Sequence, residues 1–186
     1  MIWNEALEQY VSDHQDEVVE LIRTLVAIPA FSNHEQARAE FCAKWFRDVG
    51  AEDVKIDEAS NVIVTLGDVQ AGKAVAFMAH LDTVFPDETG FELVEEDGWL
   101  KAPGVGDDTA NVALLMVITR YLLEQKCPPK QGVLIVLNAG EEGLGNLKGC
   151  RRLMQDYADK LSEVYSFDGS YKGYVNKAVG SVRYRV

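Results

Sequence analysis

Three apolar segments of strand length, each followed at once by polar or acidic residues, constrain the fold of this chain most strongly. They span residues 73–79, 132–137 and 164–167. Uninterrupted apolar runs of this kind are typical of core strands that are buried on both faces of a sheet. Helical patterns at residues 109–124 and 147–157 separate them. Strands that alternate with helices predict an α/β fold, in which helices flank a central, largely parallel or mixed sheet in a three-layer sandwich.

The remaining segments fit this architecture and leave no room for a second domain. Ser32 and Glu35 have the spacing of a capping box, so we expect a helix to begin at Ser32, and Gly50 is well placed to end it. A turn at Asp97-Gly98 predicts a hairpin. The other expected elements are a helix at 4–26, short strands at 54–56 and 61–66, hairpin strands at 91–94 and 99–102, and two β segments at 171–186.

Composition excludes several classes of protein. The formal net charge of −12 repels phosphate backbones, so we expect no nucleic-acid partner. No apolar run approaches the ~20 residues that span a bilayer, and no signal peptide is recognisable, so we expect a cytoplasmic protein without membrane contact. An odd number of cysteines without CxxC spacing argues against structural disulfides and a thiolate zinc site; they are Cys42, Cys127 and Cys150.

Histidine and carboxylate residues follow each of the three apolar strands. The ends of parallel strands meet at one edge of an α/β sheet, where ligands bind. A glycine-rich loop at residues 103–108 should bring Asp107 or Asp108 to the same edge. The residues that follow the strands are His80 and Asp82, then Glu141 and Glu142, then Asp168. Several carboxylates cannot share a buried site as ions unless divalent cations neutralise them, so this edge is predicted to bind metal.

Each of these features has an ordinary structural interpretation when taken alone. His80 could be a hydrogen-bonded core histidine, and the two aspartates of the glycine-rich loop could cap a helix. Glu141-Glu142 and Asp168-Gly169 could be turns facing solvent. Four such accidents, all at strand ends or helix starts, are much less probable than one shared site.

The ordered motifs resemble those of the co-catalytic zinc peptidases and aminoacylases. That family includes peptidase T, carboxypeptidase G, acetylornithine deacetylase and succinyl-diaminopimelate desuccinylase. The matching stretches are His80-Leu81-Asp82-Thr83-Val84, Gly106-Asp107-Asp108, Gly140-Glu141-Glu142-Gly143 and Phe167-Asp168-Gly169. Each motif is weak alone, but their order and spacing match from about residue 15 onward.

The resemblance implies two Zn²⁺ ions, which Co²⁺ or Mn²⁺ could replace, and a ligand for each. His80 and Asp168 would bind the first zinc, Glu142 the second, and Asp107 would bridge the two. Among these ligands, we expect the pocket formed by His80, Asp107 and Asp168 to be the better formed.

The same resemblance implies the catalytic roles of two further carboxylates. Glu141 would be the general base that takes a proton from the metal-activated water and passes it to the leaving amine. Asp82 would hydrogen-bond the second ring nitrogen of His80 and fix its tautomer.

Two departures from the family pattern shape what we expect of this chain. The family takes a further zinc ligand from a histidine near the end of a chain about twice as long, whereas only His14, His34 and His80 are present here. We therefore expect residues 1–186 to be the N-terminal portion of a catalytic domain, truncated before the lid domain and inactive or nearly so by itself. The full-length protein could form a homodimer through that lid. The second departure, Thr109-Ala110-Asn111, affects no ligand.

Three functions stay open at this point. An aspartate at 168 resembles the aminopeptidase branch and favours an exopeptidase that hydrolyses short peptides at the amino end. The first alternative is a deacylase of N-acyl amino acids. The second, from another class, is a non-catalytic metal-binding or interaction domain. A nucleotide-binding interpretation of Gly104-Val105-Gly106 fails because a third glycine is missing.

Overall fold

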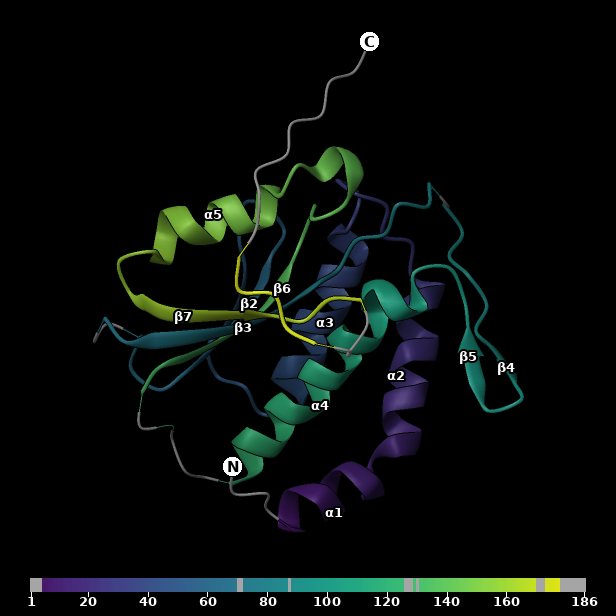
Figure 1. Cartoon of the computed structure of the whole chain (residues 1–186), viewed down its shortest axis with the longest axis horizontal. Coiled ribbons are helices and arrows are strands. Elements are labelled where there is room, and N and C mark those ends of the chain that lie inside the picture. Colours follow the sequence, from purple (N-terminus) through teal and green to yellow (C-terminus); the bar gives the residue numbers. More distant parts are fainter. Residues whose placement is uncertain are drawn as a thin grey trace.

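A mixed five-stranded sheet lies between two layers of helices (Figure 1). This computed structural model describes residues 5–69, 72–86, 88–125, 129, 131–169 and 173–177. The helical segments are α1 (Glu5–Asp13), α2 (Gln15–Ala27), α3 (Gln36–Asp48), η2 (Val105–Thr109), α4 (Ala110–Glu124), η3 (Gly143–Gly145) and α5 (Lys148–Tyr157). The strands are β1 (Val54–Ile56), β2 (Val62–Leu66), β3 (Ala74–His80), β4 (Val94–Glu96), β5 (Trp99–Lys101), β6 (Val133–Asn138) and β7 (Leu161–Ser166). The predicted α/β sandwich is confirmed.

The strand order is β1-β2-β6-β3-β7, and it places the carboxyl ends of β3, β6 and β7 at the same end of the sheet. β3 pairs in parallel with both β6 and β7, whereas β2 runs antiparallel to β1 and β6. The register pairs His80 at the end of β3 with Asn138 at the end of β6. Residues that follow β3, β6 and β7 therefore emerge side by side.

The central strand β6 is buried on both faces, and its side chains alternate between two apolar clusters. Ile135 and Leu137 belong to the larger cluster, which the sheet forms with α2, α3 and α4. Leu134 and Val136 belong to the smaller one, where Leu153 of α5 packs against the sheet. This burial on both sides explains why β6 is apolar at every position before Asn138.

The third apolar segment is not a core strand as predicted. β7 lies at the edge of the sheet, and most of its residues are exposed, with Val164 at 43% and Tyr165 at 48%. Apolar composition alone does not separate an edge strand from a central one. Of the predicted tail strands, residues 173–177 form none, and the other residues of 171–186 lie outside the described part of the chain.

The first predicted helix is divided into α1 and α2 at His14. The Nδ1 atom of His14 lies 2.7 Å from the main-chain oxygen of Tyr10, the acceptor that the N–H of residue 14 would use in a continuous helix. The main-chain N–H of His14 donates instead to the main-chain oxygen of Val11, at 3.4 Å. None of the helices in the described ranges is long and apolar enough to cross a bilayer.

The predicted capping box is also wrong, and its residues have other partners. α3 begins at Gln36 rather than at Ser32. The Ser32 hydroxyl donates to Asp82, and Glu35 accepts from the main-chain N–H of Asn33 and from Lys148. Gly50, with a φ of +96°, does end this helix as predicted.

The predicted hairpin forms with one strand displaced. Its turn lies at Asp97-Gly98, where both φ angles are positive as expected, and β5 occupies the predicted position. The first strand begins at Val94, the last residue of the predicted range 91–94, and continues to Glu96.

Candidate metal centre

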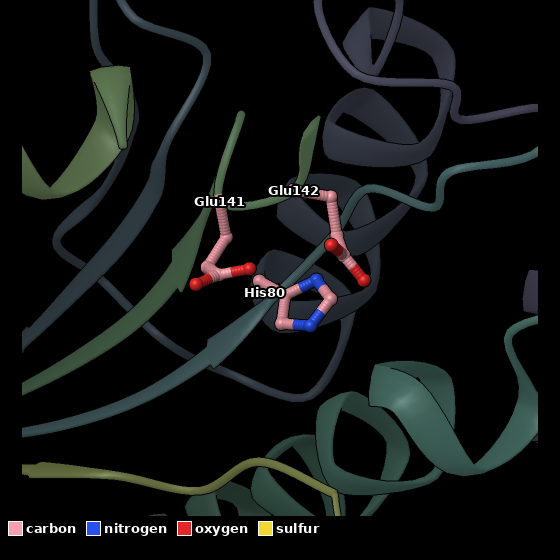
Figure 2. Close-up of side chains that lie close together, drawn as sticks. All are labelled: His80, Glu141 and Glu142. Carbon is pink, nitrogen blue, oxygen red and sulfur yellow. The ribbon is translucent and has the colours of Figure 1, made fainter. Parts of the chain in front are cut away.

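His80 is the residue around which the candidate site is built. It is the last residue of β3, and its side chain is 2% exposed. Glu141 and Glu142 come from the segment after β6 and point to either side of its ring (Figure 2). Asp168 follows β7, where the N–H of Phe167 donates to Met78 at 2.8 Å and continues the pairing with β3. The predicted convergence of three strand ends is therefore present.

Two groups of three residues could each hold a metal ion, and both include His80. In each group the candidate ligand atoms lie within 4.8 Å of one another. The first group contains Asp107 and Asp168, whose Oδ1 atoms lie 2.9 and 4.0 Å from Nε2 of His80. The second contains Glu141 and Glu142. The four expected ligands are divided between these two groups, but the second group also contains Glu141, the expected base, and lacks Asp107, the expected bridge.

Asp82 lies beneath this site and organises the loop that carries the two glutamates. Its carboxylate is fully buried and accepts hydrogen bonds from the main-chain N–H groups of Glu141 and Glu142, at 2.9 and 3.0 Å. The Ser32 hydroxyl donates to it at 2.6 Å. Burial raises the pKa of Asp82, but hydrogen bonds from His80, Ser32 and Glu141 outweigh it, so the net pKa is lowered. Asp82 is therefore an ionised scaffold for the loop.

Asp82 contacts Nδ1 of His80, the second ring nitrogen, mainly through its main-chain oxygen. Nδ1 lies 3.0 Å from the main-chain oxygen of Asp82 and 3.6 Å from its carboxylate. The main-chain oxygen is therefore the closer acceptor and holds the proton on Nδ1, leaving Nε2 directed towards Asp107.

Asp108 is a buried neighbour of the site, for which the sequence motifs predicted no role of its own. It is fully buried, and its carboxylate accepts the main-chain N–H of His80 at 2.8 Å and the side-chain amide of Asn111. Asp107, the residue before it, is 56% exposed. Asn111, part of the departure from the family pattern, supports Asp108. An amide three residues after one of two aspartates is the signal that could have distinguished them.

Electrostatics at the site favour a bound cation. Burial raises the pKa values of Asp168, Glu141 and Glu142, and the charges of neighbouring carboxylates add to this effect. Burial lowers the pKa of His80, but hydrogen bonding to Asp82, the charges of Asp108 and Asp82, and Asp107 raise it to about 10. A divalent cation would replace these protons and compensate the clustered negative charge. The donor set, one imidazole with several carboxylates, fits zinc.

The two other histidines are not part of either group of possible ligands. His14 stacks on Tyr10 at the break between α1 and α2, with ring centroids 4.0 Å apart. His34 stacks on Phe31, at 6.1 Å. Within the ranges that the structure describes, the candidate second group therefore contains no histidine besides His80.

The chain is similar to several known proteins. The sequence model described as Peptidase family M20/M25/M40 matches residues 76–182. The [LysW]-lysine hydrolase of Deinococcus radiodurans is 30% identical over 167 residues, which cover 88% of this chain and 44% of that protein.

Solved structures share the fold. The aminopeptidase PepT of Bacillus cereus superposes with a TM-score of 0.67 at 24% identity, covering 83% of this chain and 43% of that one. Human carnosine dipeptidase 1 gives a TM-score of 0.72 at 19% identity, covering 88% and 40%. The chain therefore spans less than half the length of these relatives.

Proposed function

Because this chain belongs to Peptidase family M20/M25/M40, we propose that it carries most of the active site of a dizinc exopeptidase acting at the amino end of short peptides. The observation that supports this most is the convergence of four carboxylates, those of Asp107, Glu141, Glu142 and Asp168, around His80. Four carboxylates carry more negative charge than one divalent cation compensates, which is compatible with two cations. Peptidases and other amide hydrolases make up the family, so amide-bond hydrolysis is its common chemistry.

In the proposed centre, His80 and Asp168 would hold one cation, Glu142 the other, and Asp107 would be a ligand of both. When bound, the divalent cations would lower the pKa of a bound water and polarise the scissile carbonyl. Zinc is the proposed metal, and cobalt or manganese could substitute.

Glu141 is the proposed general base. Burial, together with the charges of Asp168 and Glu142, raises its pKa. A carboxylate with a raised pKa accepts a proton from the attacking water more readily and can then deliver it to the leaving amine. The main-chain bond from Glu141 to Asp82 fixes the position of this base.

A second candidate substrate is an N-acyl amino acid, which a deacylase would hydrolyse. The 30% identity with a hydrolase of [LysW]-lysine favours this alternative. Asp168 instead of glutamate favours the peptidase. A non-catalytic metal-binding domain is the third alternative.

We also propose that residues 1–186 form the N-terminal portion of the catalytic domain, and that this portion alone turns over substrate slowly or not at all. A cytoplasmic location and dimerisation of the full-length protein through a lid domain stay predictions.

The test uses the polypeptide encoded by the full reading frame, loaded with Zn²⁺. It should hydrolyse di- and tripeptides faster than N-acetyl and N-succinyl amino acids. Glu141→Gln should lower kcat by more than about a hundredfold, within the usual range for a general base. Glu52→Gln, at an exposed position, is the matched control. Faster cleavage of the acylated substrates would favour the deacylase. Zinc binding without any hydrolysis would favour the non-catalytic domain, and activity that survives both chelator and Glu141→Gln would refute the mechanism.

A further inference from the structure

Arg38 is a buried cation that forms no ion pair with any carboxylate in the described part of the chain. It lies in the first turn of α3 and is only 3% exposed. Arginine is almost never this buried unless its charge is paired. Burial lowers the pKa of its guanidinium to about 10, so the group is still charged at neutral pH. Its hydrogen-bond partners, together with the negative charge of Asp82 nearby, therefore compensate the loss of water.

Those partners are oxygens from three segments far apart in the sequence. Nε and Nη2 donate to the main-chain oxygen of Ile28 at 3.2 and 2.7 Å. Nη1 donates to the main-chain oxygen of Leu81 at 2.8 Å, and the Thr109 hydroxyl lies 3.5 Å from the same nitrogen. One planar guanidinium thus holds three segments together, which the compact ammonium of lysine could not do.

Two of the three contact points, Leu81 and Thr109, lie beside residues of the candidate metal centre, and the third, Ile28, lies four residues before Ser32. Leu81 separates His80 from Asp82, and Thr109 directly follows the two aspartates of the glycine-rich loop. Ile28 begins the segment that leads to Ser32, whose hydroxyl donates to Asp82. Arg38 therefore contacts the backbone beside the ligands without contacting any ligand atom itself.

We propose that Arg38 is a positioning residue of the metal centre. Its guanidinium fixes the backbone that carries His80, Asp82 and Asp107, so that their side chains are arranged for a divalent cation before it binds. This inference rests on the proposed function, because it requires that the site holds metal.

The test measures zinc affinity directly in the 186-residue chain, by competition with a chromophoric chelator, together with the absorption spectrum of the Co²⁺ form and thermal unfolding. Arg38→Ala and Arg38→Lys should both weaken zinc binding by about 10–100-fold, the usual effect of losing a group that orients a metal ligand. Arg38→Lys should not keep the wild-type zinc affinity, because lysine retains the positive charge but lacks the planar, forked donor geometry of the guanidinium. Added methylguanidinium should restore part of the affinity of Arg38→Ala and the wild-type Co²⁺ spectrum.

Arg120→Ala is the matched control. Arg120 donates both terminal nitrogens to Glu17 and its Nε to Tyr10, and it joins α4 to the two N-terminal helices. This variant should lose stability while keeping the wild-type zinc affinity.

The outcomes separate this inference from the proposed function. A folded wild-type chain that binds no zinc would refute the metal centre and the role of Arg38 together. Wild-type binding that both Arg38 variants retain would refute the positioning role alone. So would an equal loss of affinity in Arg120→Ala, because the effect would then follow general stability. If Arg38→Ala fails to fold, Arg38→Lys decides: unchanged affinity contradicts the proposal, and weakened affinity with an altered Co²⁺ spectrum supports it.

Discussion

Two layers of the site contrast in how their polar groups are satisfied. The inner layer, made of Ser32, Arg38, Asp82 and Asp108, is at most 3% exposed and bonded to defined partners within the chain. The rim, made of Asp107, Glu141, Glu142 and Asp168, is more open, and Asp107 and Asp168 are 56% and 50% exposed. The inner layer is complete without metal, whereas the carboxylates of the rim repel one another. Folding therefore supplies the scaffold, and the cation completes the rim.

The largest expected effect is at Asp82, in the inner layer. Asp82→Ala leaves three buried donors without their acceptor, so we expect the free energy of unfolding to fall by about 3–5 kcal/mol. Zinc binding should be lost as well, because the loop of Glu141 and Glu142 is released. Urea denaturation with and without Zn²⁺ measures both effects. A loss below about 1 kcal/mol would show that the inner layer is not a scaffold.

Asp168→Asn is the corresponding change in the rim. We expect stability without metal to change by less than about 0.5 kcal/mol, because the side chain is half exposed and its charge repels Asp107. Zinc affinity should fall by at least about tenfold, since a ligand is lost. Chelator competition and the same denaturation experiment give the two values. A large stability loss with unchanged zinc affinity would reverse the assignment of the two layers.

The pH dependence should differ in sign between the metal-free and the metal-bound chain. The pKa of His80 is raised to about 10, above its unfolded value of about 6.5. Its contribution to stability is therefore complete below about pH 6.5 and is lost as the pH rises towards 10. Asp108, with a pKa raised to about 7, likewise destabilises the chain as it ionises between about pH 4 and 7.

Zinc requires the unprotonated imidazole, so its affinity should rise by up to about tenfold per pH unit over the same range. Thermal unfolding from pH 6.5 to 9.5, with chelator and with Zn²⁺, tests both slopes. A metal-free melting temperature that rises across this window would contradict the account.

The smallest expected effect is at Ser32. Ser32→Ala removes the hydrogen bond to the Asp82 carboxylate and the longer one to the main-chain oxygen of Glu142, and it should cost about 1 kcal/mol of stability, with a modest loss of zinc affinity. Ser162→Ala, which removes a bond to main-chain oxygens near the sheet edge, is the matched control and should leave zinc affinity unchanged. If both variants lost zinc affinity equally, the Ser32 contact would have no particular importance for the site.

The sequence predicted the rim far better than the layer beneath it. Residues that follow apolar strands are easy to identify in a sequence, and parallel pairing of those strands brings them together. The family expected from the ordered motifs was confirmed. The partners of Ser32, Arg38 and Asp108 could not be predicted, because they depend on contacts between segments that only the folded chain brings together. Ser32 and Glu35 matched a local capping pattern, but tertiary partners outcompeted it.

The place of each strand within the sheet could not be predicted for a similar reason. An apolar run predicts a strand, but only the pairing of the whole sheet decides that β6 is central and β7 lies at the edge. The break at His14 depends on one side chain replacing a backbone donor, which periodicity alone does not reveal.

The central claim is that His80 and the rim carboxylates together bind divalent cations. A crystal structure of this chain grown with Zn²⁺, with anomalous scattering recorded at the zinc edge, tests it most directly. The account predicts a zinc peak about 2.0–2.2 Å from Nε2 of His80 and from carboxylate oxygens of Asp107 and Asp168. A well-folded chain whose zinc lies away from His80, or which takes up none at concentrations that saturate ordinary zinc proteins, would contradict it.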